Sequence, residues 1–139
     1  MITTEEIATK VYQRLKDSNV ASMITGTINY GRSDYTKEDI VIVPHAIEGE
    51  KSLRFGVVKV NIHVPDIVRG ATKNPTYTTD FKRIISIRTK VIEVLKNHYE
   101  VGEGWNWTIG MLNPPIKEPN HNEHFVSLDL EITVRYKIK

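Results

Sequence analysis

The stretch FGVVKVNIHVPDI, residues 55–67, determines the fold that we predict for this chain. From Val58 to Val64 apolar residues alternate with polar ones, so one face of a strand carries valine and isoleucine while the other carries Lys59, Asn61 and His63. Pro65 cannot donate a hydrogen bond to a neighbouring strand and therefore ends the pairing. The stretch predicts a core strand, and we expect His63 on its polar face to meet either solvent or a neighbouring subunit.

Two helices are expected around the strands. Thr3 and Glu6 form a capping-box pattern at the start of the first, which ends near residues 17–19. The second begins at Thr78, Thr79 or Asp80. The apolar stripe of the first helix contains Ile7, Val11, Tyr12 and Leu15, and that of the second contains Phe81, Ile84, Ile85, Arg88, Val91, Ile92 and Leu95.

Four other segments have the composition of strands: residues 25–30, 40–47, 105–112 and 125–137, the last with unbroken alternation. The order is helix, strand, strand, strand, helix, strand, strand. Because strands joined by short loops pair antiparallel, we predict one α+β domain over residues 1–139. Its mostly antiparallel sheet has four to five strands, with two helices packed on one face.

Composition excludes several classes of protein. The 139 residues include no cysteine, so disulfides and thiolate metal sites are excluded. The acidic N-terminal stretch is unlike a signal peptide, and no apolar run is long enough to span a membrane, so we expect a soluble, cytoplasmic protein. The formal net charge of +2 is too small to indicate a polyanion partner.

Few residues suggest chemistry. His121, Glu123 and His124 in HNEH have metal-ligating side chains, but the preceding proline-rich segment argues against the helix that would align the histidines, so we favour solvated loop residues. Asp129 and Glu131 on one strand face are expected to pair with basic residues of a neighbouring strand. Catalytic triads meet only in space and leave no local pattern. Phosphate loops and nucleophile elbows are absent from the sequence, and we expect no catalytic residue, cofactor or metal ion.

Several residues are candidates for an interface. Arg88 lies within an apolar stripe, where its guanidinium must form a buried ion pair, extend to solvent or face a second copy of the protein. Tyr30, Arg32 and Tyr35 interleave aromatic and basic character, as a platform for single-stranded nucleic acid would. For Trp105 and Trp107, two apart in a strand, we favour packing in a core or an interface.

The segments EDIVIVP (38–44), GVVKVNIHVPD (56–66) and FVSLDLEITVRY (125–136), taken with the element order, resemble the tail terminator, or tail completion, family of long-tailed bacteriophages and prophages. The resemblance covers nearly the whole chain. It implies a non-enzymatic protein that forms a ring, usually a hexamer, on the end of the tail tube and joins the tube to a head-completion protein. It also implies assembly in the cytoplasm of a bacterial host and incorporation into a virion or phage-like particle.

Under this interpretation, the loops at 31–38, 65–79 and 113–124 are candidates for contacts with neighbours, because long irregular loops are usually functional or disordered. Three alternatives stay open. The chain resembles other head–tail connector or neck proteins in the same way. A nucleic-acid-binding module would use the tyrosines, tryptophans and Arg32 beside Lys82, Lys90 and Lys96, and a small hydrolase would need His63 or the HNEH histidines in a cleft.

Overall fold

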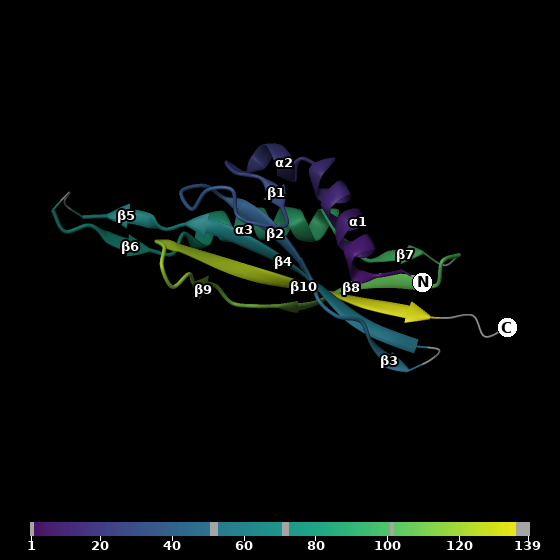
Figure 1. The fold of residues 1–139 in the computed structure, drawn as a ribbon. Coiled ribbons are helices and arrows are strands. Elements are labelled where there is room, and N and C mark those ends of the chain that lie inside the picture. The colour runs from purple at the N-terminus through teal and green to yellow at the C-terminus, as the bar shows by residue number, and fades with distance from the viewer. Residues whose placement is uncertain (1, 51–52, 71–72, 101, 136–139) are drawn as a thin grey trace.

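Helices line one side of a long twisted sheet, and a narrow two-stranded arm projects from one end (Figure 1). The computed structural model describes residues 2–50, 53–70, 73–100 and 102–135. In this part of the chain, none of the helices combines the length and the apolar character needed to cross a membrane.

Helix α1 (Thr4–Lys16) begins with the predicted capping box, in which Thr3 and Glu6 each accept a hydrogen bond from the other's backbone N–H. A short helix that we did not predict, α2 (Val20–Met23), follows it. Helix α3 (Phe81–Val94) begins after Asp80, whose carboxylate accepts a hydrogen bond from the Arg83 backbone N–H at 3.1 Å. The starts of both long helices are thus fixed by side chains that the sequence identifies.

The main sheet has eight strands. Its central path runs in the order β1 (Ile28–Asn29), β2 (Asp39–Pro44), β4 (Leu53–Pro65), β10 (Glu123–Arg135), β8 (Trp105–Leu112) and β7 (His98–Glu100). Strand β3 (Glu48–Glu50) also pairs with β4, and β9 (Ile116–Lys117) pairs with β10. Strands β5 (Ile67–Arg69) and β6 (Thr76–Thr78) form a separate antiparallel pair, the arm in Figure 1.

The predicted fold class is wrong. Instead of a mostly antiparallel sheet of four to five strands with two helices, the described residues form a mixed eight-stranded sheet with three helices. Strands β3, β7 and β9 have only two or three residues, too few to show alternation, and pair beside longer strands. Strand β1 is parallel to β2, because residues 30–38 return the chain to the end of the sheet at which β1 begins. At that end the Gly26 N–H, just before β1, donates to the Glu38 carbonyl, just before β2, at 2.8 Å.

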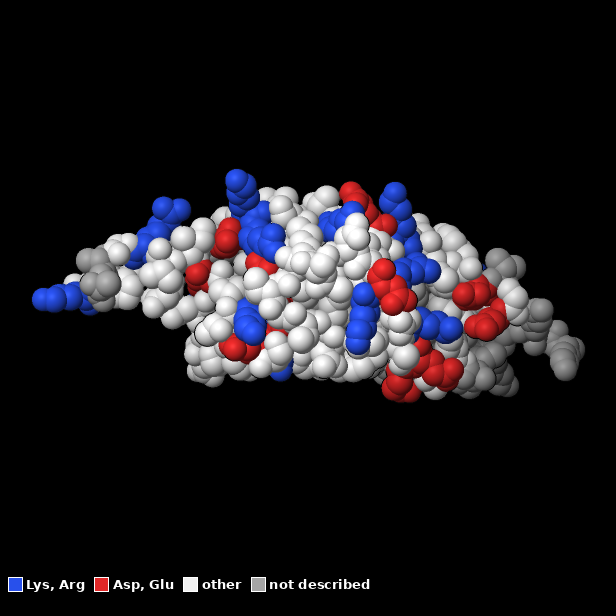
Figure 2. Space-filling model, turned by 90° about the horizontal axis from the view of Figure 1, so that it is seen from above, with Lys and Arg blue, Asp and Glu red and all other residues white. Residues whose placement is uncertain are grey.

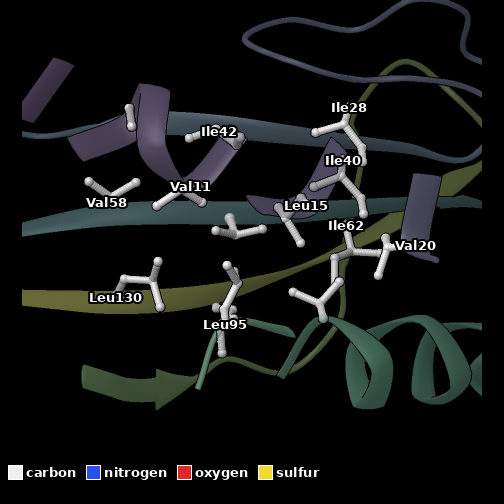
Figure 3. Packing of buried hydrophobic residues seen from close by; sticks show 14 of the residues in the cluster. Val11, Leu15, Val20, Ile28, Ile40, Ile42, Val58, Ile62, Leu95 and Leu130 are labelled. Carbon is white, nitrogen blue, oxygen red and sulfur yellow. The ribbon is translucent and has the colours of Figure 1, made fainter. Parts of the chain in front are cut away.

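The predicted alternation of residues 58–64 is confirmed. Val58, Val60, Ile62 and Val64 are buried on the helix-covered side of the sheet. There they join Val11 and Leu15 of α1, Val20 of α2 and Leu95, which follows α3 (Figure 3). Strand β10 adds Val126, Leu128, Leu130, Ile132 and Val134 to this core. The end of the predicted last strand, residues 136–137, lies outside the described residues.

The predicted apolar stripe of α3 is partly wrong. Ile84, Val91 and Leu95 are buried, but Ile87 completes the buried face, while Phe81 and Ile85 are 59% and 56% exposed. The helix is therefore rotated relative to the prediction. Its surface carries two large apolar side chains close to the base of the arm.

Candidate functional site

A buried ionic cluster centred on Arg32 lies on the face of the sheet opposite the core. Arg32 comes from the loop between β1 and β2, and its side chain is only 12% exposed. It donates to Asp39 Oδ2 at 2.8 Å and also to Glu123 Oε2. Both carboxylate side chains are completely buried. The loop is thereby held to the first residues of β2 and β10.

The Asp39 carboxylate accepts several further hydrogen bonds. Its Oδ1 accepts from the Ser33 hydroxyl at 2.6 Å and from the Thr27 backbone N–H at 2.8 Å. Burial alone would raise the pKa of Asp39, but these bonds, together with the backbone N–H groups of Ser33 and Asp34, lower it below the usual value. Asp39 is therefore ionised at neutral pH and anchors the loop from within.

His63 belongs to this cluster, which contradicts the expectation that it meets solvent or a subunit. Its exposed fraction is 7%, its Nδ1 lies 3.2 Å from Glu123 Oε1, and its ring stacks on Phe125 with centroids 5.0 Å apart. The face is polar, as predicted, but the Arg32 loop covers it at this end of the sheet. Burial and the nearby Arg32 charge lower the pKa of His63 to about 4, so the imidazole is neutral at neutral pH.

Glu123 has the opposite perturbation. Burial raises its pKa to about 7, although the Arg32 charge acts in the other direction. The carboxylates of Glu118, Asp39 and Asp66 add to the rise. A neutral imidazole thus lies beside a carboxyl group that exchanges its proton near neutral pH. In the part of the chain that the structure describes, His63, Glu118 and Glu123 also form the one group whose ligand atoms are close enough to hold a metal ion.

The structure brings Tyr35 to the edge of the same cluster. The Arg32 guanidinium lies 4.9 Å from the centroid of the Tyr35 ring, which stacks on His121 at 3.5 Å. Tyr30 lies elsewhere, stacked on Tyr12 of α1 at 5.5 Å. The expected platform of Tyr30, Arg32 and Tyr35 is therefore divided between two places.

Trp105 and Trp107 are packed inside the protein. Their exposed fractions are 2% and 1%, and His98 lies against both rings. The indole N–H of Trp107 donates to the Leu95 carbonyl at 3.2 Å. Neither ring is accessible to a base or to another subunit.

Arg88 is half-buried on α3. Its Nη1 donates to the Asn113 carbonyl at 3.0 Å, and it forms no ion pair with the residues that the structure describes. Asp129, in contrast, pairs with Lys59 across strands at 3.5 Å, as predicted for this residue. Arg88 therefore connects α3 to the segment after β8.

His124 holds the two ends of the arm. Its Nδ1 lies 2.6 Å from Asp66 Oδ1, and its Nε2 lies 3.1 Å from the Thr79 hydroxyl. Asp66 directly precedes β5, and Thr79 directly follows β6. The Thr79 hydroxyl, the His124 imidazole and the Asp66 carboxylate occur in the order of a catalytic triad. Because Asp66 and Thr79 flank the arm, however, we interpret these two hydrogen bonds as fixing the base of the arm. Neither Asp66 nor this role of Thr79 could be recognised from the sequence.

The arm exposes apolar and basic side chains. Val68 and Tyr77, directly paired across its strands, are 61% and 43% exposed. Arg69 and Lys73 are also exposed. The region predicted as a long loop from residue 65 to residue 79 thus contains a hairpin with an apolar surface and positive charge.

A hollow of about 530 Å³ lies toward the other end of β4. Ala46, Phe55 and Val57 supply apolar surface to its lining, and Glu48, Asp129 and Glu131 supply acidic groups. Figure 2, which views the helix-covered face, shows Lys and Arg side chains along the whole length of the molecule and Asp and Glu side chains mainly toward the end away from the arm. From Phe55 to Pro65, β4 extends about 33 Å at roughly 3.3 Å per residue, which separates the hollow from the base of the arm.

Comparison with known proteins gives little beyond the fold. No protein-family model and no curated protein matches the chain. One solved structure, whose name describes no function, is similar with a TM-score of 0.50 and 14% sequence identity. The alignment covers 96% of this chain and 98% of that chain. At this identity the likeness concerns the fold alone.

Proposed function

We propose that the chain is a non-enzymatic assembly protein of the phage tail terminator type. It forms a closed ring of identical subunits that caps the tail tube and joins it to the head. The observation that carries this proposal is the pair of complementary surfaces, arm and hollow, at opposite ends of β4. By family resemblance the ring is a hexamer, assembled in the cytoplasm of the bacterial host, and its partners are the tail tube and head-completion proteins.

The two surfaces complement each other in charge and in apolar character. The arm presents Val68 and Tyr77 beside Arg69 and Lys73. The hollow combines the exposed Phe55 with Glu48, Asp129 and Glu131; Lys59 also lines it and pairs with Asp129 at 3.5 Å, so Glu48 and Glu131 supply its remaining negative charge. Since they lie at different ends of one subunit, the arm of each copy would enter the hollow of the next, and such a head-to-tail interface forms a ring when the rotation closes.

A stable interface of this kind needs more surface than the hairpin tip offers, because specific interfaces bury roughly 1,200–2,000 Å² in total. Phe81 and Ile85, exposed on α3 beside the base of the arm, are suited to supply the additional apolar area. Their exposure is otherwise unfavourable for an isolated subunit.

Light scattering and native mass spectrometry at several concentrations, with and without purified tail tubes, test this proposal. Tyr77→Asp in the arm is expected to abolish ring formation with no loss of thermal stability. Tyr99→Asp is the matched control, because Tyr99 is 60% exposed on β7 and lines neither the hollow nor the arm. A chain that stays monomeric at all concentrations and on tubes would overturn the proposal.

Charge reversal tests the pairing of the two surfaces. Lys73→Glu and Glu131→Lys should each weaken assembly, and mixing the two variants should restore it, because a ring in which they alternate pairs opposite charges at every interface. Capping of tubes distinguishes a tail terminator from a neck protein, which would form rings without stopping tube growth.

A further inference from the structure

Three potential metal ligands meet on the polar face of the sheet. His63 comes from β4, Glu123 is the first residue of β10, and Glu118 lies in the turn between β9 and β10. One ligand atom from each lies within 4.8 Å of the other two. A tetrahedral zinc ion with bonds near 2.1 Å separates its ligand atoms by about 3.4 Å. A small rotation of Glu118, the half-exposed member, would close the remaining gap.

Two of the ligands are already held in place: an ion would leave the Arg32 contact of Glu123 and the stacking of His63 intact and would replace the hydrogen bond between His63 Nδ1 and Glu123 Oε1. Glu123 uses Oε2 for Arg32, while its Oε1 faces His63 Nδ1 at 3.2 Å. The His63 ring is held by stacking on Phe125. The Glu118 backbone N–H donates to the Glu123 carbonyl at 3.0 Å, which sets the turn that brings the third ligand in. The site is thus organised before any ion binds.

The charge balance of the cluster favours a cation at this place. Asp39 and Glu123 are completely buried and bond to the same guanidinium, that of Arg32. Glu118 adds a third carboxylate that forms no ion pair with any residue in the described ranges. One guanidinium thus faces two buried carboxyl groups with a third, half-exposed carboxylate beside them, an arrangement in which a bound cation would be favoured.

We propose that His63, Glu118 and Glu123 bind a divalent transition-metal ion of the zinc type, with a fourth position for water. One imidazole nitrogen and two carboxylate oxygens are ligands that zinc accepts, whereas calcium and magnesium are bound by oxygen alone. The ion would tie the turn after β9 to the central strand β4. This site is independent of ring formation and uses neither His121 nor His124 of the HNEH motif, which bind Tyr35 and the arm.

Calorimetric titration of the full chain with zinc chloride, after treatment with a chelator, tests the site. We expect one ion per chain, a higher melting temperature with zinc, and little effect of magnesium chloride. Glu118→Gln removes one ligand from a half-exposed position, so the variant should fold, and its zinc affinity should fall about 10- to 100-fold, the range known for disturbed metal sites. Cobalt chloride supplies an independent spectroscopic signal, because a low-symmetry bound cobalt ion absorbs strongly in the visible range.

Glu131→Gln is the matched control, since Glu131 is an exposed glutamate on the same strand outside the site. It should leave the zinc affinity unchanged. His63→Gln should abolish the cobalt absorption where that variant folds. Absence of zinc binding to the wild-type chain, or zinc affinity that Glu118→Gln leaves intact, would overturn the proposal.

Discussion

Replacement of Arg32 by methionine tests how much the buried ionic cluster contributes to stability. Arg32→Met keeps most of the side-chain length but removes the charge that contacts Asp39 and Glu123, both completely buried. Breaking a buried ion pair by removing one partner costs about 3–5 kcal/mol, because the remaining charge is left uncompensated. Glu123 can take up a proton, since its pKa is already raised to about 7, but Asp39 stays ionised. We therefore expect the free energy of unfolding to fall by an amount near the lower value, about 3 kcal/mol.

This loss corresponds to a large change in melting temperature. With an unfolding entropy of about 2.1 cal/mol/K per residue, 1 kcal/mol shifts the melting temperature of a chain of this size by about 3.4 °C. Arg32→Met should thus melt about 10 °C lower. Circular dichroism and urea unfolding, both with a chelator present, measure the melting temperature and the free energy of unfolding.

Lys59→Met supplies the control. Lys59 pairs with Asp129 at 3.5 Å on the same face of the sheet, but the two side chains are 36% and 17% exposed. Such a solvent-accessible pair contributes about 0–1 kcal/mol. If Arg32→Met lost no more stability than Lys59→Met, the argument that Arg32 compensates buried carboxylates would be refuted.

Three further changes probe the same end of the molecule. Gly26→Ala should cost about 1–3 kcal/mol in urea unfolding, because its Cβ would overlap the Asp39 carboxylate; unchanged stability would contradict this packing. The pKa of Asp39 lies below the usual 3.8, so its ionised form contributes stability that is complete above about pH 4 and is lost as the pH falls through the lower, folded-state pKa. A melting temperature that stays constant down to pH 2 would exclude that contribution. His124→Gln should release the bonds to Asp66 and Thr79 and speed proteolysis of the arm at residues 67–78, whereas equal cleavage of wild type and variant would show that His124 does not hold it.

Local sequence signals predicted the elements that are long enough to repeat a pattern. The alternation in β4 and β10 and the capping box of α1 are all present in the structure. The features that the sequence did not predict depend on contacts between residues far apart in the chain. Nothing local indicates that β1 is parallel to β2, because that direction is set by the loop that Asp39 and Arg32 anchor. The rotation of α3 likewise follows from which residues the sheet buries and not from spacing alone.

The metal-ligating residues of HNEH were hard to interpret because adjacent residues of a strand belong to opposite faces. Glu123 and His124 follow one another in β10, so their side chains point to different sides of the sheet. Glu123 joins Arg32 and His63 on the polar face, while His124 meets Asp66 and Thr79 at the base of the arm. A motif of consecutive letters is therefore two separate sites. The neighbours that define each site come from about 45 to 91 residues away, which is why His63, with its strand considered alone, was expected to meet solvent or another subunit.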